Sequence, residues 1–120
     1  MSTKGDNVAN LATQVIGLTG LAPAYSAAAG GGDTFTPGDD VFLHVKNGGG
    51  APQTVTVVTP NTAAGGLAIS DVAVAVPAAG ERMIGPFPKQ NFSRAADGLG
   101  DITYSGVTSV TVAVLDARRV

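Results

Sequence analysis

The chain has 120 residues, which is enough for one domain, or one domain and a tail, to bury a core without cross-links. It contains no Cys, and this excludes a disulfide framework and thiolate chemistry. The formal net charge is -2 at pH 7, from seven basic and nine acidic residues with no basic run, so we expect no nucleic-acid partner.

The first 20 residues differ in pattern from the rest of the chain. Four apolar residues recur there at spacings of three, four and three, which would place them along one face of a helix: Val8, Leu11, Val15 and Leu18. A helix this short, with several glycines around it, is marginal on its own. We therefore expect a short helix or a disordered leader that becomes ordered against its own domain or a neighbour.

The sequence predicts no targeting or membrane segment. Polar residues interrupt the apolar part of the N-terminal stretch, so no secretory signal is expected. No run of about 20 apolar residues occurs, so no membrane span and no membrane partner are expected. We expect the protein to be synthesised in a cytoplasm.

Residues 21–32 form a low-complexity stretch, LAPAYSAAAGGG. Ala24–Ala28 is predicted as an edge strand, and Gly30–Gly32 as a flexible joint. The joint divides the chain into an N-terminal arm, residues 1–32, and a compact domain, residues 33–120.

The compact domain consists of short valine-rich runs in which apolar and polar or small side chains alternate. This period of two on β-branched residues is typical of strands with one buried face. The runs are VFLHVKN (41–47), QTVTVVTP (53–60), DVAVAVP (71–77), ERMIGPFP (81–88), DITYS (101–105) and SVTVAVLDA (109–117). The first two are predicted to form a hairpin, and residues 89–101 a long loop.

No crossover helix is predicted between these strands, so they are expected to pair mainly antiparallel. Six to eight short strands in about 90 residues predict an all-β antiparallel sandwich, either immunoglobulin-like or jelly-roll, with an extended N-terminal arm. The apolar members of the alternating runs are predicted to face inward: Val41, Leu43, Val45, Val55, Val57, Val72, Val74, Val76, Ile84, Val110, Val112 and Val114.

Side chains able to do catalytic or metal chemistry are few. His44 is the only histidine and shares a strand face with Phe42 and Lys46, so it is predicted to be a surface or interface residue rather than a ligand. Three aspartates lie around a turn at a spacing that matches no calcium loop: Asp33, Asp39 and Asp40. We expect no catalytic residue, no metal and no cofactor, and therefore no enzyme.

Three stretches resemble a known family: PGDDVFLHVKN (37–47), VPAAGERMIGPF (76–87) and YSGVTSVTVAVL (104–115). They resemble the small all-β virion proteins of tailed bacteriophages that infect actinobacteria, and the Ala-, Gly- and Val-rich composition is similar to that of such phage proteins. The resemblance covers residues 35–115. It implies a decoration, or cement, protein on the outer capsid surface, with the major capsid protein as its partner and often a homotrimer as its assembly. That family has no catalytic motif, so no functional residue is carried over.

The arm is the predicted capsid contact, because so short a tail cannot bury its own apolar residues: Val8, Leu11, Val15 and Leu18. Deleting residues 1–20 is expected to leave a folded domain that no longer decorates capsids. The alternative is a β-sandwich tail component, a head-completion component or a surface-binding module that recognises protein or carbohydrate. A sugar-binding face usually presents Trp or Tyr, and this chain has no Trp and two Tyr.

Overall fold

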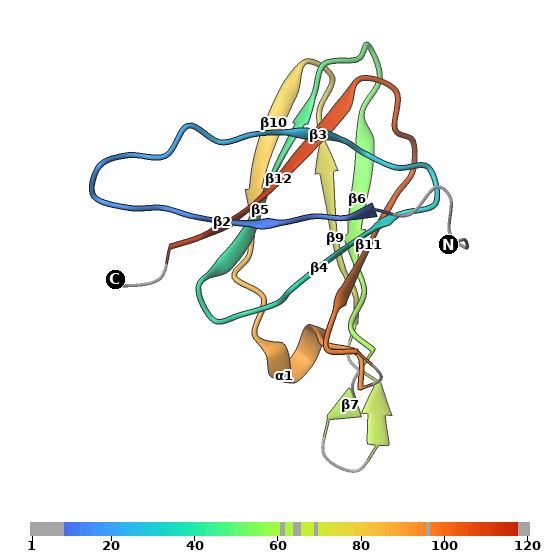
Figure 1. Ribbon diagram of the computed structural model, residues 1–120. Coiled ribbons are helices and arrows are strands. Elements are labelled where there is room, and N and C mark those ends of the chain that lie inside the picture. Colours follow the sequence, from blue (N-terminus) through green and yellow to red (C-terminus); the bar gives the residue numbers. More distant parts are fainter. Residues whose placement is uncertain (1–8, 61, 64–65, 69, 96, 118–120) are drawn as a thin grey trace, which may run out of the picture.

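The computed structural model describes residues 9–60, 62–63, 66–68, 70–95 and 97–117, and nearly all of its regular structure is β (Figure 1). The expected all-β sandwich is confirmed. The strands are β1 (Ala9–Asn10), β2 (Thr13–Val15), β3 (Ser26–Ala27), β4 (Asp33–Phe35), β5 (Val41–Asn47), β6 (Gln53–Val57), β7 (Thr62–Ala63), β8 (Leu67–Ala68), β9 (Val72–Val76), β10 (Gly80–Ile84), β11 (Gly100–Tyr104) and β12 (Val110–Asp116). The one α-helix of the described residues, α1, is Lys89–Phe92.

Two sheets form the sandwich, and β7 and β8 form a separate small hairpin. The first sheet has the order β1-β4-β11-β6-β9, and the second has the order β10-β5-β12. The far edge of β12 pairs with β3 along one half and with β2 along the other. Of the strand pairs in the described part of the chain, only β1 with β4 and β2 with β12 are parallel, so antiparallel pairing dominates, as expected.

The strand order identifies the topology as a jelly roll. Numbered one to eight from β3 to β12 without the small hairpin, the strands lie in the order one-eight-three-six in one sheet and two-seven-four-five in the other. This is the arrangement of two interlocked Greek keys. It resolves the alternative that the sequence left open between a jelly roll and an immunoglobulin-like sandwich.

The hairpin predicted from residues 41–47 and 53–60 is wrong, because β5 and β6 lie in different sheets. The connection crosses from one sheet to the other, and the buried side chain of Asn47 organises it. Asn47 Nδ2 donates to the carbonyl of Ala51 at 2.8 Å, and Oδ1 accepts from the amide of Gly49 at 2.9 Å. A side chain that satisfies buried loop amides makes such a crossing stable.

The core lies between the two sheets and agrees with the predicted inward set. Ten of the twelve residues are buried, while Val72 and Val74 are partly buried and pack against that core. The core also contains a group of phenylalanine rings in edge-to-face contact that strand alternation did not predict: Phe35, Phe87 and Phe92. The last of these belongs to α1, which occupies the start of the region predicted as a loop.

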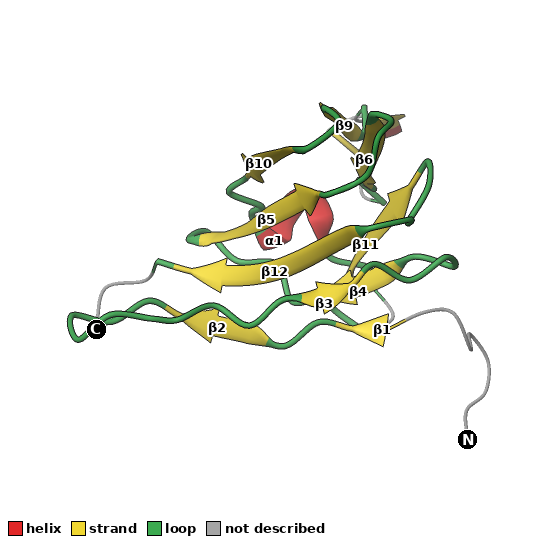
Figure 2. Cartoon of the chain, turned by 90° about the horizontal axis from the view of Figure 1, so that it is seen from above, coloured by secondary structure: helices red, strands yellow, loops and turns green. Residues whose placement is uncertain are grey.

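The described part of the N-terminal arm is extended and lies along the sandwich, so the helical interpretation is wrong for residues 9–20. β1 pairs with the edge of one sheet and β2 with the edge of the other. Leu11, between them, is only 7% exposed, and its amide donates to the carbonyl of Thr34 at 2.7 Å. Figure 2 shows these strands along one side of the sandwich. Leu11 therefore fills the space between the two sheet edges.

Gly30–Gly32, predicted as a flexible joint, forms part of a tight turn between β3 and β4. The amide of Gly32 donates to the carbonyl of Ala29 at 2.9 Å. Gly32 has φ +99, and a Cβ there would lie 2.6 Å from the carbonyl oxygen of Ile102. The backbone conformation and the close approach both require glycine at this position.

We predict that Leu11→Ala lowers the free energy of unfolding by about 2 kcal/mol or more, because it empties a buried site between the sheets. Leu18→Ala is the matched control, since the same side chain is fully exposed there and its loss should change stability little. Urea denaturation of the two variants measures both effects. Equal stability of the two variants would contradict the position of Leu11.

Candidate functional site

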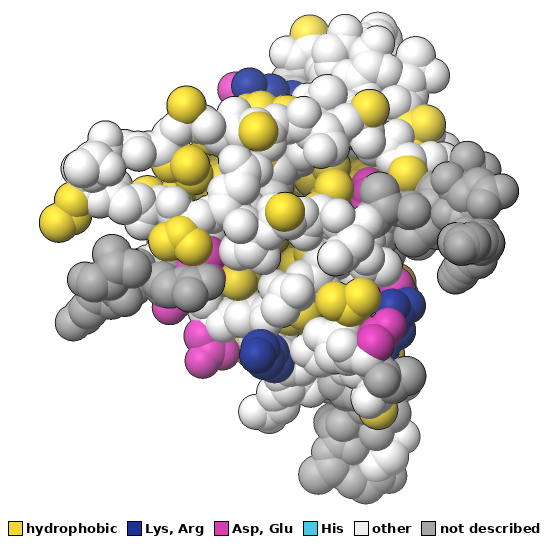
Figure 3. Space-filling view, viewed as in Figure 1, with side chains coloured by type: hydrophobic (Ala, Val, Ile, Leu, Met, Phe, Trp, Pro, Cys, Tyr) yellow, Lys and Arg dark blue, Asp and Glu magenta, His cyan; other side chains and the backbone are white. Residues whose placement is uncertain are grey.

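A loop without a charged residue projects from the sandwich between β2 and β3 (Figure 1, at the left). Leu18 near its tip is fully exposed, and Ile16 at its start is 37% exposed. In Figure 3 this projection carries hydrophobic side chains among uncharged ones. Large apolar side chains on a projection make contact area available to another molecule.

Hydrogen bonds hold the base of this loop. Gln14 acts as a clamp between the two legs, because its Nε2 donates to the carbonyl of Ala24 and its Oε1 accepts from the Ala24 amide, both at 2.8 Å. The amide of Ile16 also donates to the carbonyl of Asp116 at 2.9 Å. A side-chain amide can replace a backbone amide in such a pair because it has the same donor and acceptor. The loop is thereby fixed to β12.

The returning leg of the loop ends at Tyr25, on the outer face of the sheet that contains β12. In the register of β3 and β12, Ser26 is paired with Val112, which places Tyr25 beside Ala113. On its other side, Ala113 is paired with His44 of β5. The small side chain of Ala113 leaves room for the ring to cross the strand. Tyr25 Oη then lies 2.6 Å from His44 Nδ1.

Two further side chains join this pair. Glu81 on β10 contacts His44 Nε2 through its carboxylate, and Lys46 Nζ lies 4.1 Å from the centroid of the Tyr25 ring. A carboxylate only accepts hydrogen bonds, so Nε2 carries the proton, and in the neutral imidazole Nδ1 accepts from the Tyr25 hydroxyl. The cluster of Tyr25, His44, Lys46 and Glu81 therefore fastens the loop across three strands of one sheet.

His44 lies on the outer strand face, as expected, but its side chain is only 15% exposed because Tyr25 and Glu81 contact its ring. Among the described residues, no group of three or more His, Cys, Asp or Glu side chains is placed to hold a metal ion. The cluster combines a chain of hydrogen bonds, from Tyr25 through His44 to Glu81, with a cation–π contact between Lys46 and the Tyr25 ring. Both interactions stabilise the position of the loop.

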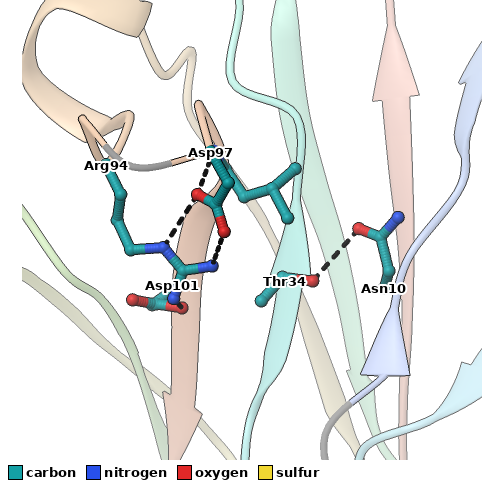
Figure 4. A network of polar contacts seen from close by, with 6 residues as sticks. Asn10, Thr34, Arg94, Asp97 and Asp101 are labelled. Atoms are coloured by element: carbon teal, nitrogen blue, oxygen red, sulfur yellow. Dashed lines mark hydrogen bonds and ion pairs between the residues drawn. The ribbon is translucent and has the colours of Figure 1, made fainter. Parts of the chain in front are cut away.

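A second polar cluster lies on the outer side of the other sheet (Figure 4). Arg94 donates from Nη2 to Asp97 Oδ2 at 2.6 Å and from Nη1 to Asp101 Oδ1 at 2.8 Å. The hydrogen bond from Arg94 lowers the pKa of Asp97, and the bond to Asp97 contributes most to a raised pKa of Arg94. Arg94 is therefore paired with two carboxylates, and it holds the segment between α1 and β11 in place.

The three aspartates noted in the sequence do not form a site. Asp33 is buried, while Asp39 and Asp40 are exposed in the turn before β5. The hydroxyl of Tyr104 donates to Asp33 Oδ2, and the amide of Ala29 donates to the same oxygen at 3.3 Å. Burial, together with this hydrogen bond to Asp33, raises the pKa of Tyr104 far above its ordinary value.

The structure separates the predicted arm contacts. Leu11 belongs to the core, whereas Val15 is 38% exposed and Leu18 is fully exposed. The three side chains therefore do not form the single apolar face that the sequence predicted. Val8 lies outside the described residues. Gln14 and Tyr25, which fix the loop, were not predicted from the sequence. The glycines on either side of Leu18, Gly17 and Gly20, are the sequence feature from which a turn could have been predicted here.

Comparisons with models of protein families, with curated proteins and with solved structures found no match. No described helix is long and apolar enough to cross a membrane. The function must therefore be inferred from the surfaces of this chain itself.

We predict that Tyr104→Phe destabilises the fold more than Tyr25→Phe. The first change removes a donor from a buried carboxylate, which costs about 1–3 kcal/mol, whereas the second removes a partly exposed hydrogen bond worth about 1 kcal/mol. Urea denaturation of the two variants, which lose the same atom, gives the comparison. A larger loss for Tyr25→Phe would contradict the buried position of Asp33.

Proposed function

We propose that the chain is a structural virion protein that binds the outer surface of the capsid of a tailed phage and stabilises it. Its partner in this proposal is the major capsid protein, and its place is the outside of the virion. The protein acts through binding and not through catalysis. The projecting loop with Leu18 at its tip makes the contact, in place of the helical arm expected from the sequence.

The observation that supports this proposal most is an exposed apolar tip on a loop with a fixed base. Leu18 is fully exposed, and burying such a side chain against a partner gains about 25 cal/mol per Å² of apolar surface. The Gln14 clamp and the contact of Tyr25 with His44 hold the legs of the loop before any partner binds. A loop that is ordered in advance loses less conformational entropy on binding.

The small contact made by one loop can be sufficient on a regular capsid shell, where many copies bind side by side. One loop offers few apolar side chains, so a single attachment is weak, but copies bound side by side on a lattice reinforce each other through avidity. The jelly roll is also found in viral capsid proteins, and in lectins, so this support is an analogy of fold. The loop lacks charged side chains, which favours an apolar contact over electrostatic attachment.

The test is binding of the full chain to empty, undecorated shells assembled from the major capsid protein of the same phage. We expect Leu18→Asp to lower binding at least tenfold, because the contact would bury an unpaired charge. Ala78→Asp is the matched control, because Ala78 is exposed in the turn between β9 and β10, away from the loop. Cosedimentation over a range of concentrations measures occupancy and affinity.

Each outcome has a distinct meaning. Unchanged binding of Leu18→Asp would show that another surface contacts the shell. Failure of the unmodified chain to bind any shell would reject the capsid function and favour a tail or surface-binding role. A point substitution is preferred to deletion of residues 1–20, because that deletion would also remove Leu11 and two edge strands.

A further inference from the structure

The free edge of β9 has none of the features that usually protect an edge strand. β9 pairs with β6 on one side only, and among the described residues no strand pairs with its other side. Figure 2 shows it at the end of the sandwich opposite the N-terminal strands. Its sequence, Val-Ala-Val-Ala-Val, has no charge, no proline and no glycine. Such an edge is a ready template for another strand.

The neighbouring edge strand provides a contrast within the same molecule. β10, at the corresponding edge of the other sheet, carries the exposed charges of Glu81 and Arg82, and Pro86 follows soon after its end. Charged side chains and proline are the usual means by which an edge strand is protected from pairing. The chain therefore protects one of two adjacent edges and leaves β9 open.

The backbone groups that β9 offers can be identified from the ladder. The Ser105 amide donates to the carbonyl of Thr54, so the backbone groups of Thr54 point toward β11, and those of Val55 point toward β9. Val74, the partner of Val55, therefore bonds within the sheet. Successive residues of a strand direct their backbone groups to opposite sides, so the N–H and C=O groups of Ala73 and Ala75 point away from β6, toward the free edge.

We propose that this edge pairs antiparallel with the same edge of a second copy of the chain, about a two-fold axis at Val74. The sequence of β9 reads the same in both directions, so the axis places Ala73 of one copy opposite Ala75 of the other. Each of these pairs exchanges both backbone hydrogen bonds. Every outward N–H and C=O group of Ala73 and Ala75 then has a partner, and the two five-stranded sheets become one continuous sheet.

The side chains fit the same axis. Val72 and Val74 are only partly buried at this edge although they pack against the core, so a second copy would cover apolar surface that one chain leaves open. Ala73 and Ala75 project from the exposed face of the sheet, and their side chains are too small to crowd each other across the axis. Asp71, the nearest charged residue, falls opposite Pro77 of the second copy, so the pairing brings no like charges together.

The self-complementary sequence is the reason for choosing a second copy over another partner. A two-fold interface requires one surface that matches itself, and a palindromic strand with outward groups placed symmetrically about its centre meets this requirement. The inference does not depend on capsid binding, which involves the loop on the other side of the sandwich.

The test compares Ala75→Pro with Ala75→Thr in the full chain. Proline removes the outward N–H but no hydrogen bond to β6, so the monomer should fold while the dimer weakens at least tenfold. Threonine keeps the N–H and suits a strand, so this variant should dimerise like the parent. Sedimentation equilibrium over a range of concentrations measures the dissociation constant, and circular dichroism checks the fold.

A second variant covers the case in which proline disturbs the monomer. Ala73→Lys with Ala75→Lys changes two exposed side chains and places lysines opposite lysines across the axis, so we expect a folded monomer. A dimer in the parent and in Ala75→Thr that is lost in the lysine variant supports the proposal. A parent that is monomeric or trimeric, or a dimer that the lysine variant preserves, would overturn it.

Discussion

The structure depends on the pairing of β12 with strands from the opposite end of the chain. One edge of β12 pairs with β5, and the other pairs with β3 and β2, so the last strand of the chain lies next to two strands from its N-terminal segment. Residues far apart in sequence must meet to form this ladder, which costs the entropy of closing a long loop. The hydrogen bonds along the strand and the burial of the core offset this cost. The jelly-roll order requires this pairing, because it brings the two Greek keys together.

The candidate binding loop is a consequence of the same pairing. β2 runs parallel to β12 and β3 runs antiparallel to it, so the segment between them must reverse direction beyond the end of the sheet. That reversal places Leu18 outside the body of the protein. β12 also supplies Ala113, whose small side chain allows Tyr25 to reach His44. The position of the loop is thus set by the strand beneath it.

The two ends of the sandwich have different roles. At one end the N-terminal strands extend both sheets, and Leu11 fills the space between their edges. At the other end β9 and β10 finish the two sheets, with charges on β10 and none on β9. The N-terminal strands β1 and β2 thus cover one end of the sandwich, and the β9 edge at the other end is the surface that we propose for pairing with a second copy.

The sequence by itself determined the fold class and most of the core. Alternating valines on β5, β9 and β12 require one buried face each, because a period of two separates the two sides of a strand. Only the tertiary structure decided which strands pair. It assigned β5 and β6 to different sheets and placed Leu11 in the core but Leu18 in solvent. It also joined Tyr25, His44 and Glu81 across three strands. Local patterns fix how a segment buries its side chains, but strand partners are chosen by long-range contacts that no local spacing encodes.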